Sequence, residues 1–268
     1  MSDAERLAGY IDVWWQAIND FTTLLEELVP QDWAEPTDLP GWNVHDVAAH
    51  TAHLEAVLAG EPEETVEVAE VPHARGVMGR YTEQGVLARR EHTPDELISE
   101  IRESATRRHT GLLADPPTVG TGQPSVVFGG MPWDWELLLR NRPLDVWMHE
   151  QDVRRATGRP GNLDTAPAEH TVDYMGEALG VIVGKRVAPP AGTTVVLAPS
   201  GSSPVAVEVG DDGRARPIDP PEDPTVRIEL SREDFIVTSG GRRSPSQVAF
   251  FGERELGQQV IDSYRTTP

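Results

Sequence analysis

Apolar residues near the start of the chain recur every three or four positions, as they do along one face of a helix. They fall at Leu7, Ile11, Trp14, Ile18, Phe21, Leu25 and Leu28. This alternation of steps is typical of a helix packed in a bundle. Because proline interrupts a helix, we predict a long first helix that ends at Val29 and Pro30.

The second and third helical patterns begin at capping sequences. Asn43 is followed three residues later by Asp46, so a second helix should start there and run to Gly60. Thr93 and Glu96 have the same spacing with a proline between them, which is a strong signal for a third helix start. Each helix should therefore be fixed at its first turn by a side chain that accepts from the backbone.

A fourth helical pattern covers about residues 133–156 and is followed by Gly158 and Pro160. Residues 61–92 and 115–132 show no such period, and we predict two long loops there, which would shape a substrate pocket. Four helices joined by long crossing connections are typical of a four-helix bundle. We predict that the bundle occupies residues 1–160.

The pattern of the chain changes after the bundle. Short β-rich runs separated by turn sequences replace the long helical periods. The expected strands are 194–198, 205–209 and 226–230, and the expected helices are 166–183, a short one capped by Ser231, and 253–264. We therefore predict an α + α/β protein in which residues 161–268 form a small α+β domain.

Composition excludes several functions. The chain has 23 basic and 44 acidic residues, a net charge of −21, so its field should repel nucleic acid and anionic membranes. It contains no cysteine, which excludes disulfides, thiolate metal ligands and a thiol nucleophile of its own. Any thiol chemistry must use a thiol from outside. We see neither a signal peptide nor an apolar run long enough for a membrane span, and expect a soluble cytoplasmic protein.

The fourth predicted helix carries charged residues in line with its apolar stripe. Asp145 and His149 are four residues apart, so they lie on one face, and Asp152 follows at the next turn. Leu138 and Ala156 continue the same stripe toward the core. An unpartnered buried charge is costly, and binding a metal ion is one way to compensate it. Asp145 could also pair with Arg142 or Arg140, and Asp152 with Arg155 or His149.

His50 points to the apolar side of the second predicted helix, between Val47 and Leu54. Together with Asp145 and His149 it would make a set of two histidines and one carboxylate, the ligand count of a catalytic zinc site with an open position. The alternative is that His50 is a hydrogen-bonded core histidine. We expect the neighbouring His45 and His53 to be solvated.

These residues, in this order, resemble the mycothiol-dependent maleylpyruvate isomerase family, a branch of the DinB-like metalloenzymes. The resemblance rests on Leu39-Pro40-Gly41-Trp42, on His50 eight residues later, and on Asp145-Val146-Trp147-Met148-His149-Glu150-Gln151-Asp152-Val153. Farther on, Val226-Arg227-Ile228-Glu229-Leu230, Gly241-Arg242 and Phe251-Gly252 are similar to the family's C-terminal domain, which is akin to a sterol-carrier fold. The resemblance covers nearly the whole chain.

The resemblance implies a zinc ion, or another divalent metal, held by His50, Asp145 and His149. The family usually has Glu where this chain has Asp145, so Glu150 or Asp152 could substitute as the acid ligand. It also implies that Arg242 orients an anionic substrate or stabilises a developing enolate. Arg242, with its neighbour Arg243, would otherwise be a solvated residue of a turn.

The chemistry that the resemblance implies uses an external thiol. Zinc would bind mycothiol and hold its thiolate beside a small electrophile, either maleylpyruvate-like or a xenobiotic, in an isomerase or transferase reaction. One alternative is a hydrolase in which zinc-bound hydroxide is helped by Asp152 or Glu150 as the general base. Another is a non-catalytic binding or stress module. We expect a monomer or homodimer.

Overall fold

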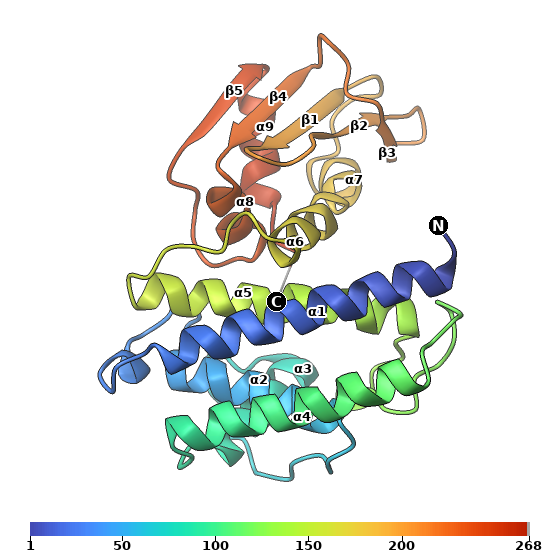
Figure 1. Ribbon diagram of the computed structural model, residues 1–268. Helices are drawn as coiled ribbons and strands as arrows, with labels where there is room; N and C mark the ends of the chain where they lie inside the picture. The colour runs from blue at the N-terminus through green and yellow to red at the C-terminus, as the bar shows by residue number, and fades with distance from the viewer. Residues whose placement is uncertain (267–268) are drawn as a thin grey trace. The chain divides into compact units, whose positions relative to one another are not determined.

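The computed structural model describes residues 1–266 and divides the chain into two compact units (Figure 1). The first unit comprises Met1–Gly161 and is helical, whereas the second begins at Asn162 and contains a mixed sheet with helices. This architecture confirms the predicted α + α/β fold class. Among the described residues, no helix combines the length and the apolarity that crossing a bilayer requires.

Five α-helices and two short 3₁₀ turns make up the first unit. They are α1 (Asp3–Glu26), η1 (Asp32–Ala34), α2 (Val44–Leu58), α3 (Gly76–Ala88), α4 (Pro94–Ala114), η2 (Phe128–Gly130) and α5 (Trp135–Ala156). Helix α1 packs along α5, and α2 packs between α4 and α5 (Figure 1). The four long helices are therefore those that the apolar period predicts.

Capping side chains set the helix starts. Asn43 accepts from the Asp46 backbone N–H at the start of α2, and the Asp46 carboxylate accepts from the Asn43 backbone N–H. Thr93 and Glu96 make the same reciprocal pair at α4. Each pair satisfies N–H groups that have no partner within the helix. The predicted starts of the second and third long helices are confirmed.

Helix α3 corrects the prediction of one long loop over residues 61–92. Its sequence holds several glycines, which lower helix propensity and hide the helical period. Gly85 shows why a glycine is needed, because a Cβ there would lie 2.2 Å from the ring of His53 on α2. Close packing on α2 therefore stabilises a helix that local propensity does not predict.

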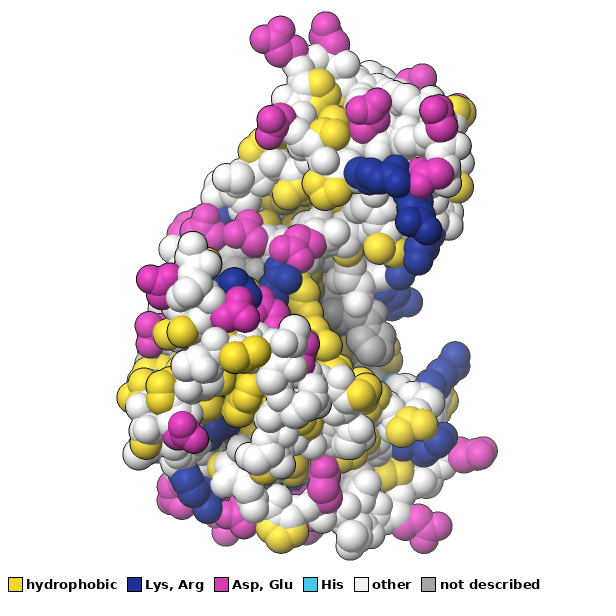
Figure 2. All heavy atoms as spheres, turned by 90° about the vertical axis from the view of Figure 1, so that its right-hand side faces the viewer, with side chains coloured by type: hydrophobic (Ala, Val, Ile, Leu, Met, Phe, Trp, Pro, Cys, Tyr) yellow, Lys and Arg dark blue, Asp and Glu magenta, His cyan; other side chains and the backbone are white. Residues whose placement is uncertain are grey.

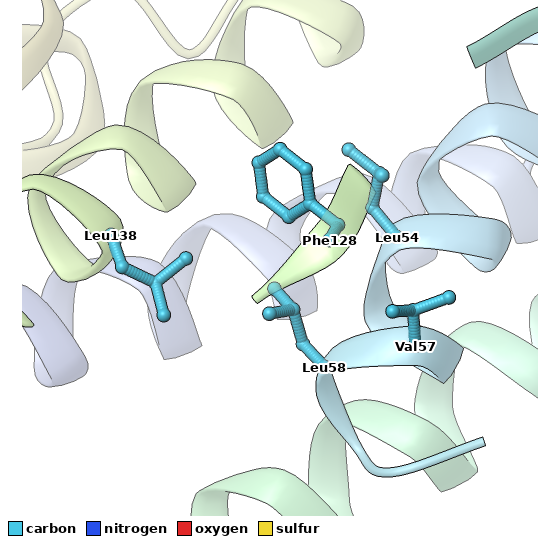
Figure 3. Packing of buried hydrophobic residues seen from close by; sticks show 5 residues of the cluster. All are labelled: Leu54, Val57, Leu58, Phe128 and Leu138. Carbon is cyan, nitrogen blue, oxygen red and sulfur yellow. The ribbon is translucent and has the colours of Figure 1, made fainter. Parts of the chain in front are cut away.

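A cluster of apolar side chains joins α2, η2 and α5. Phe128 from η2 packs with Leu54, Val57 and Leu58 of α2 and with Leu138 of α5. Figure 3 shows these side chains gathered around Phe128. Phe128 is 4% exposed, so the connection before α5 is anchored in the core rather than solvated.

The second unit is built on one five-stranded sheet. Its helices are α6 (Ala166–Gly176), α7 (Leu179–Val181), the π-helical η3 (Ile182–Val187), α8 (Arg232–Ser239) and α9 (Arg254–Ser263). Its strands are β1 (Thr194–Pro199), β2 (Val205–Val209), β3 (Ala215–Ile218), β4 (Val226–Leu230) and β5 (Val248–Gly252). The strand order is β3-β2-β1-β4-β5, with β1 and β4 parallel and the other pairs antiparallel (Figure 1).

The two edge strands, β3 and β5, were not predicted from the sequence. Strand β3 contains Arg216 and Pro217, and neither residue marks a buried strand. Strand β5 has the apolar sequence VAFFG, and its Phe251 is 55% exposed. The sequence therefore lacks the alternation of apolar and polar residues that marks a strand with one buried face. Edge strands bury less surface than central ones, so their hydrophobic pattern is weaker. The three central strands are confirmed.

Candidate metal centre

Three predicted side chains converge between α2 and α5. The Nε2 atom of His50 lies 3.7 Å from one carboxylate oxygen of Asp145, and the Nε2 atom of His149 lies 3.7 Å from the other. One possible ligand atom from each residue lies within 4.8 Å of the other two. The i, i+4 spacing on α5 brings Asp145 and His149 together, and the packing of α2 on α5 adds His50.

Burial and charge set the protonation of this cluster. Burial lowers the pKa of His50, although Asp145 opposes the shift. For Asp145, burial alone would raise the pKa, but Arg142 and the two histidines together hold it well below its usual range. His50 is therefore neutral and Asp145 is ionised near pH 7. These are the forms of both residues that bind a metal ion.

Asp152 lies on the other side of His149 from Asp145. Its Oδ2 atom is 3.2 Å from Nδ1 of His149, and its Oδ1 accepts from Arg155 at 2.5 Å. Arg155 also donates to Asp38 at 2.7 Å. A carboxylate on one ring nitrogen fixes the orientation of the imidazole and leaves the other nitrogen for a ligand.

The neighbouring acid Glu150 is also outside the three-residue cluster. It is fully buried and accepts from Arg154 at 2.7 Å. The carboxylate that the structure places between His50 and His149 is that of Asp145. The shorter side chain of this aspartate, compared with the usual glutamate, still reaches both histidines.

A buried network of charges holds Asp145, and only its pair with Arg142 follows from the sequence. Arg142 is fully buried, donates to Asp145 at 2.8 Å and donates to Glu55 at 2.7 Å. Glu55 also accepts from Trp14 at 3.1 Å and pairs with Arg108 at 3.4 Å. Of the two partners considered for Asp145, the structure pairs it with Arg142. Glu55 was missed because it lies on a helix whose other buried residues are mostly apolar.

Trp42, from the motif before α2, packs against both histidines. Its ring centroid lies 5.1 Å from that of His50 and 6.3 Å from that of His149. The indole Nε1 donates to Glu83 of α3 at 2.8 Å, and Glu83 also contacts Nε2 of His73 at 3.1 Å. The preceding Gly41 has φ +85°, and a Cβ there would lie 2.3 Å from the His73 ring. The motif thus places the indole of Trp42 beside the cluster.

His53 contradicts the expectation of a solvated side chain. It is 1% exposed, and its Nδ1 lies 3.5 Å from Arg89. Its Nε2 has no hydrogen-bond partner among the described residues. Burial and the nearby Arg89 lower the pKa of His53 to about 3. The error follows from the missed helix α3, which covers this face of α2. His45 is partly exposed and pairs with the His92 carbonyl at 2.8 Å.

Arg242 lies in the second unit, in the turn after α8. It is half-buried, and one of its guanidinium nitrogens donates to the Gly240 carbonyl at 2.7 Å. Its predicted contact with substrate stays a prediction.

The fold and the converging side chains together define a two-domain protein with a candidate His-Asp-His metal centre. Residues 14–154 match the family model of the mycothiol maleylpyruvate isomerase N-terminal domain, and residues 169–259 match the C-terminal domain of that family. The chain therefore belongs to the mycothiol maleylpyruvate isomerase family, which confirms the resemblance seen in the sequence. By family it is an isomerase-like enzyme.

Proteins similar to this chain include curated sequences and solved structures. Two uncharacterized proteins of Mycobacterium tuberculosis, from strains CDC 1551 / Oshkosh and H37Rv, are each 25% identical over 237 residues, covering 85% of this chain and 83% of theirs. The crystal structure of a mycothiol-dependent maleylpyruvate isomerase is 17% identical with a TM-score of 0.55. That of a histidine-to-alanine mutant of a mycothiol-dependent maleylpyruvate isomerase is 15% identical with the same TM-score. Each of the two covers 93% of this chain and 95% of its own. At these identities the structures support the fold.

Proposed function

We propose that this protein is a metal-dependent isomerase or transferase that uses mycothiol as an external thiol and acts on a small electrophile. The observation that carries the proposal is the convergence of His50, Asp145 and His149. Family membership supports the thiol, and the absence of cysteine agrees with it, because a thiol reaction would have to bring the thiol from outside. The proposed metal is zinc.

The three side chains fit such an ion. Donor atoms bound to one tetrahedral zinc ion lie roughly 3.4 Å apart, given metal–ligand distances of about 2.1 Å. The distances from Asp145 to the two histidines are both 3.7 Å, so small side-chain movements would close the site. Two nitrogens and one carboxylate leave a coordination position open. A structural zinc site would instead be closed by four protein ligands.

Each neighbouring residue has a role in this proposal. A bound zinc ion would supply a Lewis acid that favours the thiolate form of the external thiol. Asp152 orients His149 through Nδ1, and Arg142 orients Asp145 through its Oδ2. Trp42 shields the two imidazoles from water on one side. Asp152 is thus a positioning residue, and Arg242 remains the proposed contact for an anionic substrate.

Elemental analysis of tag-free protein tests the metal. We expect near-stoichiometric zinc in the wild type and little in His50→Ala and His149→Ala variants that fold normally by circular dichroism. His109→Ala is the matched control, because this histidine stacks on Trp15 outside the cluster and its loss should leave the metal content unchanged. A wild type that binds no zinc after reconstitution would rule out the catalytic proposal and leave a binding module.

Assays with and without mycothiol then test the reaction. We expect isomerisation of maleylpyruvate, or consumption of a xenobiotic electrophile, only when mycothiol is present. Hydrolysis of the substrate without any thiol would instead identify a zinc hydrolase.

A further inference from the structure

The sheet of the second unit ends in two edge strands that differ in character. At one edge, β3 contains Arg216 and Pro217, and Arg216 pairs with Asp212 at 2.7 Å. Charged residues and prolines are features by which natural sheets prevent another strand from pairing with an edge. Figure 2, which views the molecule from the side on which β3 lies in Figure 1, likewise shows charged side chains of both signs. The β3 edge is therefore protected.

The opposite edge, β5, has neither of these features. Its five residues, VAFFG, include no charged residue and no proline, although 25% of the residues in the whole chain are charged. Phe251 is 55% exposed, and Ala249, on the same face of the strand, is exposed as well. An apolar edge strand that is open to solvent is a site where another strand can add to a sheet.

Hydrogen bonds show which residues of β4 face β5. The Leu230 carbonyl accepts from the Ser200 N–H on the β1 side, whereas the Thr225 carbonyl accepts from the Glu253 N–H on the β5 side, both at 2.9 Å. The backbone groups of successive residues in a strand point alternately to its two neighbours. Odd-numbered residues of β4 therefore bond to β5, and even-numbered ones to β1.

The free backbone groups of β5 follow from this alternation. In the antiparallel register, the odd-numbered residues of β4 lie opposite Phe251 and Ala249, whose backbone groups therefore point to β4. Phe250, between them, directs its N–H and C=O to the open side of the sheet. Neither group has a hydrogen-bond partner among the described residues. A second strand could satisfy both.

This edge is complementary to itself. If two copies of β5 pair antiparallel about Phe250, this residue faces its own copy, and the two exchange both backbone hydrogen bonds. On each side of that pair, Ala249 of one copy faces Phe251 of the other, so that each exposed phenylalanine covers an exposed alanine. Beyond the strand, Glu253 faces Gln247, so like charges do not oppose each other there.

We propose that β5 pairs with β5 of a second copy of this chain, so that two five-stranded sheets become continuous across a twofold axis at Phe250. Contacts of this kind, in which the same surface of both copies is used, are the commonest in homo-oligomers. The net charge of −21 on each copy opposes association, but charges farther apart than about 8 Å are largely screened at physiological ionic strength. Because one short strand makes a small interface, we expect a weak, reversible dimer.

Sedimentation equilibrium of the full chain tests the pairing. We expect a monomer–dimer equilibrium within about 1–300 µM, a range suited to a small interface. Phe251→Lys places a charge in both symmetric pairs and should weaken association at least about ten-fold. The matched control is Val181→Lys, because Val181 is 50% exposed in the same unit and lies outside the strand; its effect should be less than about two-fold. A wild type that stays monomeric, or equal effects of the two substitutions, would overturn the proposal.

Disulfide formation tests the register, because the chain has no cysteine of its own. A mixture of Ala249→Cys and Phe251→Cys should cross-link unlike copies, since the Cα atoms of such a facing pair lie about 4.5 Å apart. In either variant alone the two cysteines are diagonal neighbours at about 7–8 Å, beyond the usual span of a disulfide, and should cross-link at least about five-fold more slowly.

Equal cross-linking rates in the mixture and in the separate variants would mean that the copies meet through another surface, which would contradict the proposal. Circular dichroism should show that both cysteine variants fold as the wild type does. The pairing is independent of the metal centre, so His149→Ala should dimerise as the wild type does whatever its metal content. Loss of the dimer in His149→Ala that retains the wild-type fold would show that the second unit does not pair by itself and would equally refute the proposal.

Discussion

The two units use arginine in opposite ways. In the first unit Arg142 is fully buried and is held between Glu55 and Asp145, at 2.7 and 2.8 Å. In the second unit Arg254 and Arg265 are exposed, and the partners that hold them in place are an aromatic ring and a carbonyl. Removing charge from water is costly, so a buried guanidinium requires carboxylate partners, whereas an exposed one remains solvated and available to a ligand.

The buried arginine Arg142 therefore helps to hold the helices of the first unit together, whereas the exposed arginines of the second unit do not have this role. The Glu55–Arg142–Asp145 network joins α2 to α5, the two helices that carry the candidate metal ligands. Its geometry is therefore set before any ligand arrives. Arg254 and Arg265 have an aromatic ring and a backbone carbonyl as their neighbours instead. Substitutions should accordingly be severe in the first region and mild in the second.

The largest expected effect is the loss of the buried carboxylate Glu55. Glu55→Gln leaves Arg142 and Arg108 buried with less compensating charge, which should lower the free energy of unfolding by about 3–5 kcal/mol. Urea unfolding followed by the helical circular dichroism signal measures it. The control is Glu229→Gln, because Glu229 pairs with Arg227 near the surface and should contribute less than about 1 kcal/mol. Equal losses would contradict the contrast between buried and exposed pairs.

The next effect concerns metal affinity. Asp152→Asn removes the carboxylate that orients His149, so zinc affinity should fall about 10- to 100-fold, equivalent to roughly 1.4–2.7 kcal/mol. Competition with a chromophoric chelator measures this change. Glu150→Gln is matched in burial and lies outside the cluster, and it should alter the affinity less than about three-fold. A smaller change in Asp152→Asn than in Glu150→Gln would show that Asp152 does not position the ligand.

A third effect depends on pH and involves His53. The unfolded chain protonates this histidine near pH 6.5, whereas the folded chain does so at a pKa of about 3. Its contribution to stability is therefore complete above pH 6.5 and is lost as the pH falls toward 3. Between pH 7 and pH 5 this loss is about 2 kcal/mol. Unfolding measured at both pH values should show that His53→Gln has the smaller dependence by that amount, and identical slopes would refute the assignment.

The smallest effect is expected at Glu83, whose carboxylate contacts an indole and an imidazole. Glu83→Ala removes the acceptor for the Trp42 indole and the contact with His73, and should cost about 0.5–1.5 kcal/mol of stability. Glu83→Gln keeps an acceptor and should recover most of that loss. Tryptophan fluorescence during zinc titration should report a weaker response in Glu83→Ala, since Trp42 lies beside both histidines. An unchanged response would show that α3 does not hold the Trp42 side chain in place.

Much of the fold followed from periodic patterns and capping residues. The stripe from Leu7 to Leu28 and the Asn43 and Thr93 caps predicted long helices that the structure contains. Helix α3 and the edge strands β3 and β5 were missed because their stability comes from neighbours. Gly85, for example, weakens α3 locally but allows it to approach His53.

The candidate site, like the fold, could be predicted from the sequence only where local spacing determines it. The spacing of Asp145 and His149 on one helix places both on one face, so the sequence by itself determined that this pair would act together. It also determined, through the absence of cysteine, that the protein has no thiol of its own. Only the tertiary structure decided that His50 would complete the cluster and that Arg142 and Glu55 would be buried behind Asp145. Such contacts join residues far apart in the chain, and the free energy that selects them comes from burying and pairing charges between helices, which no local spacing encodes.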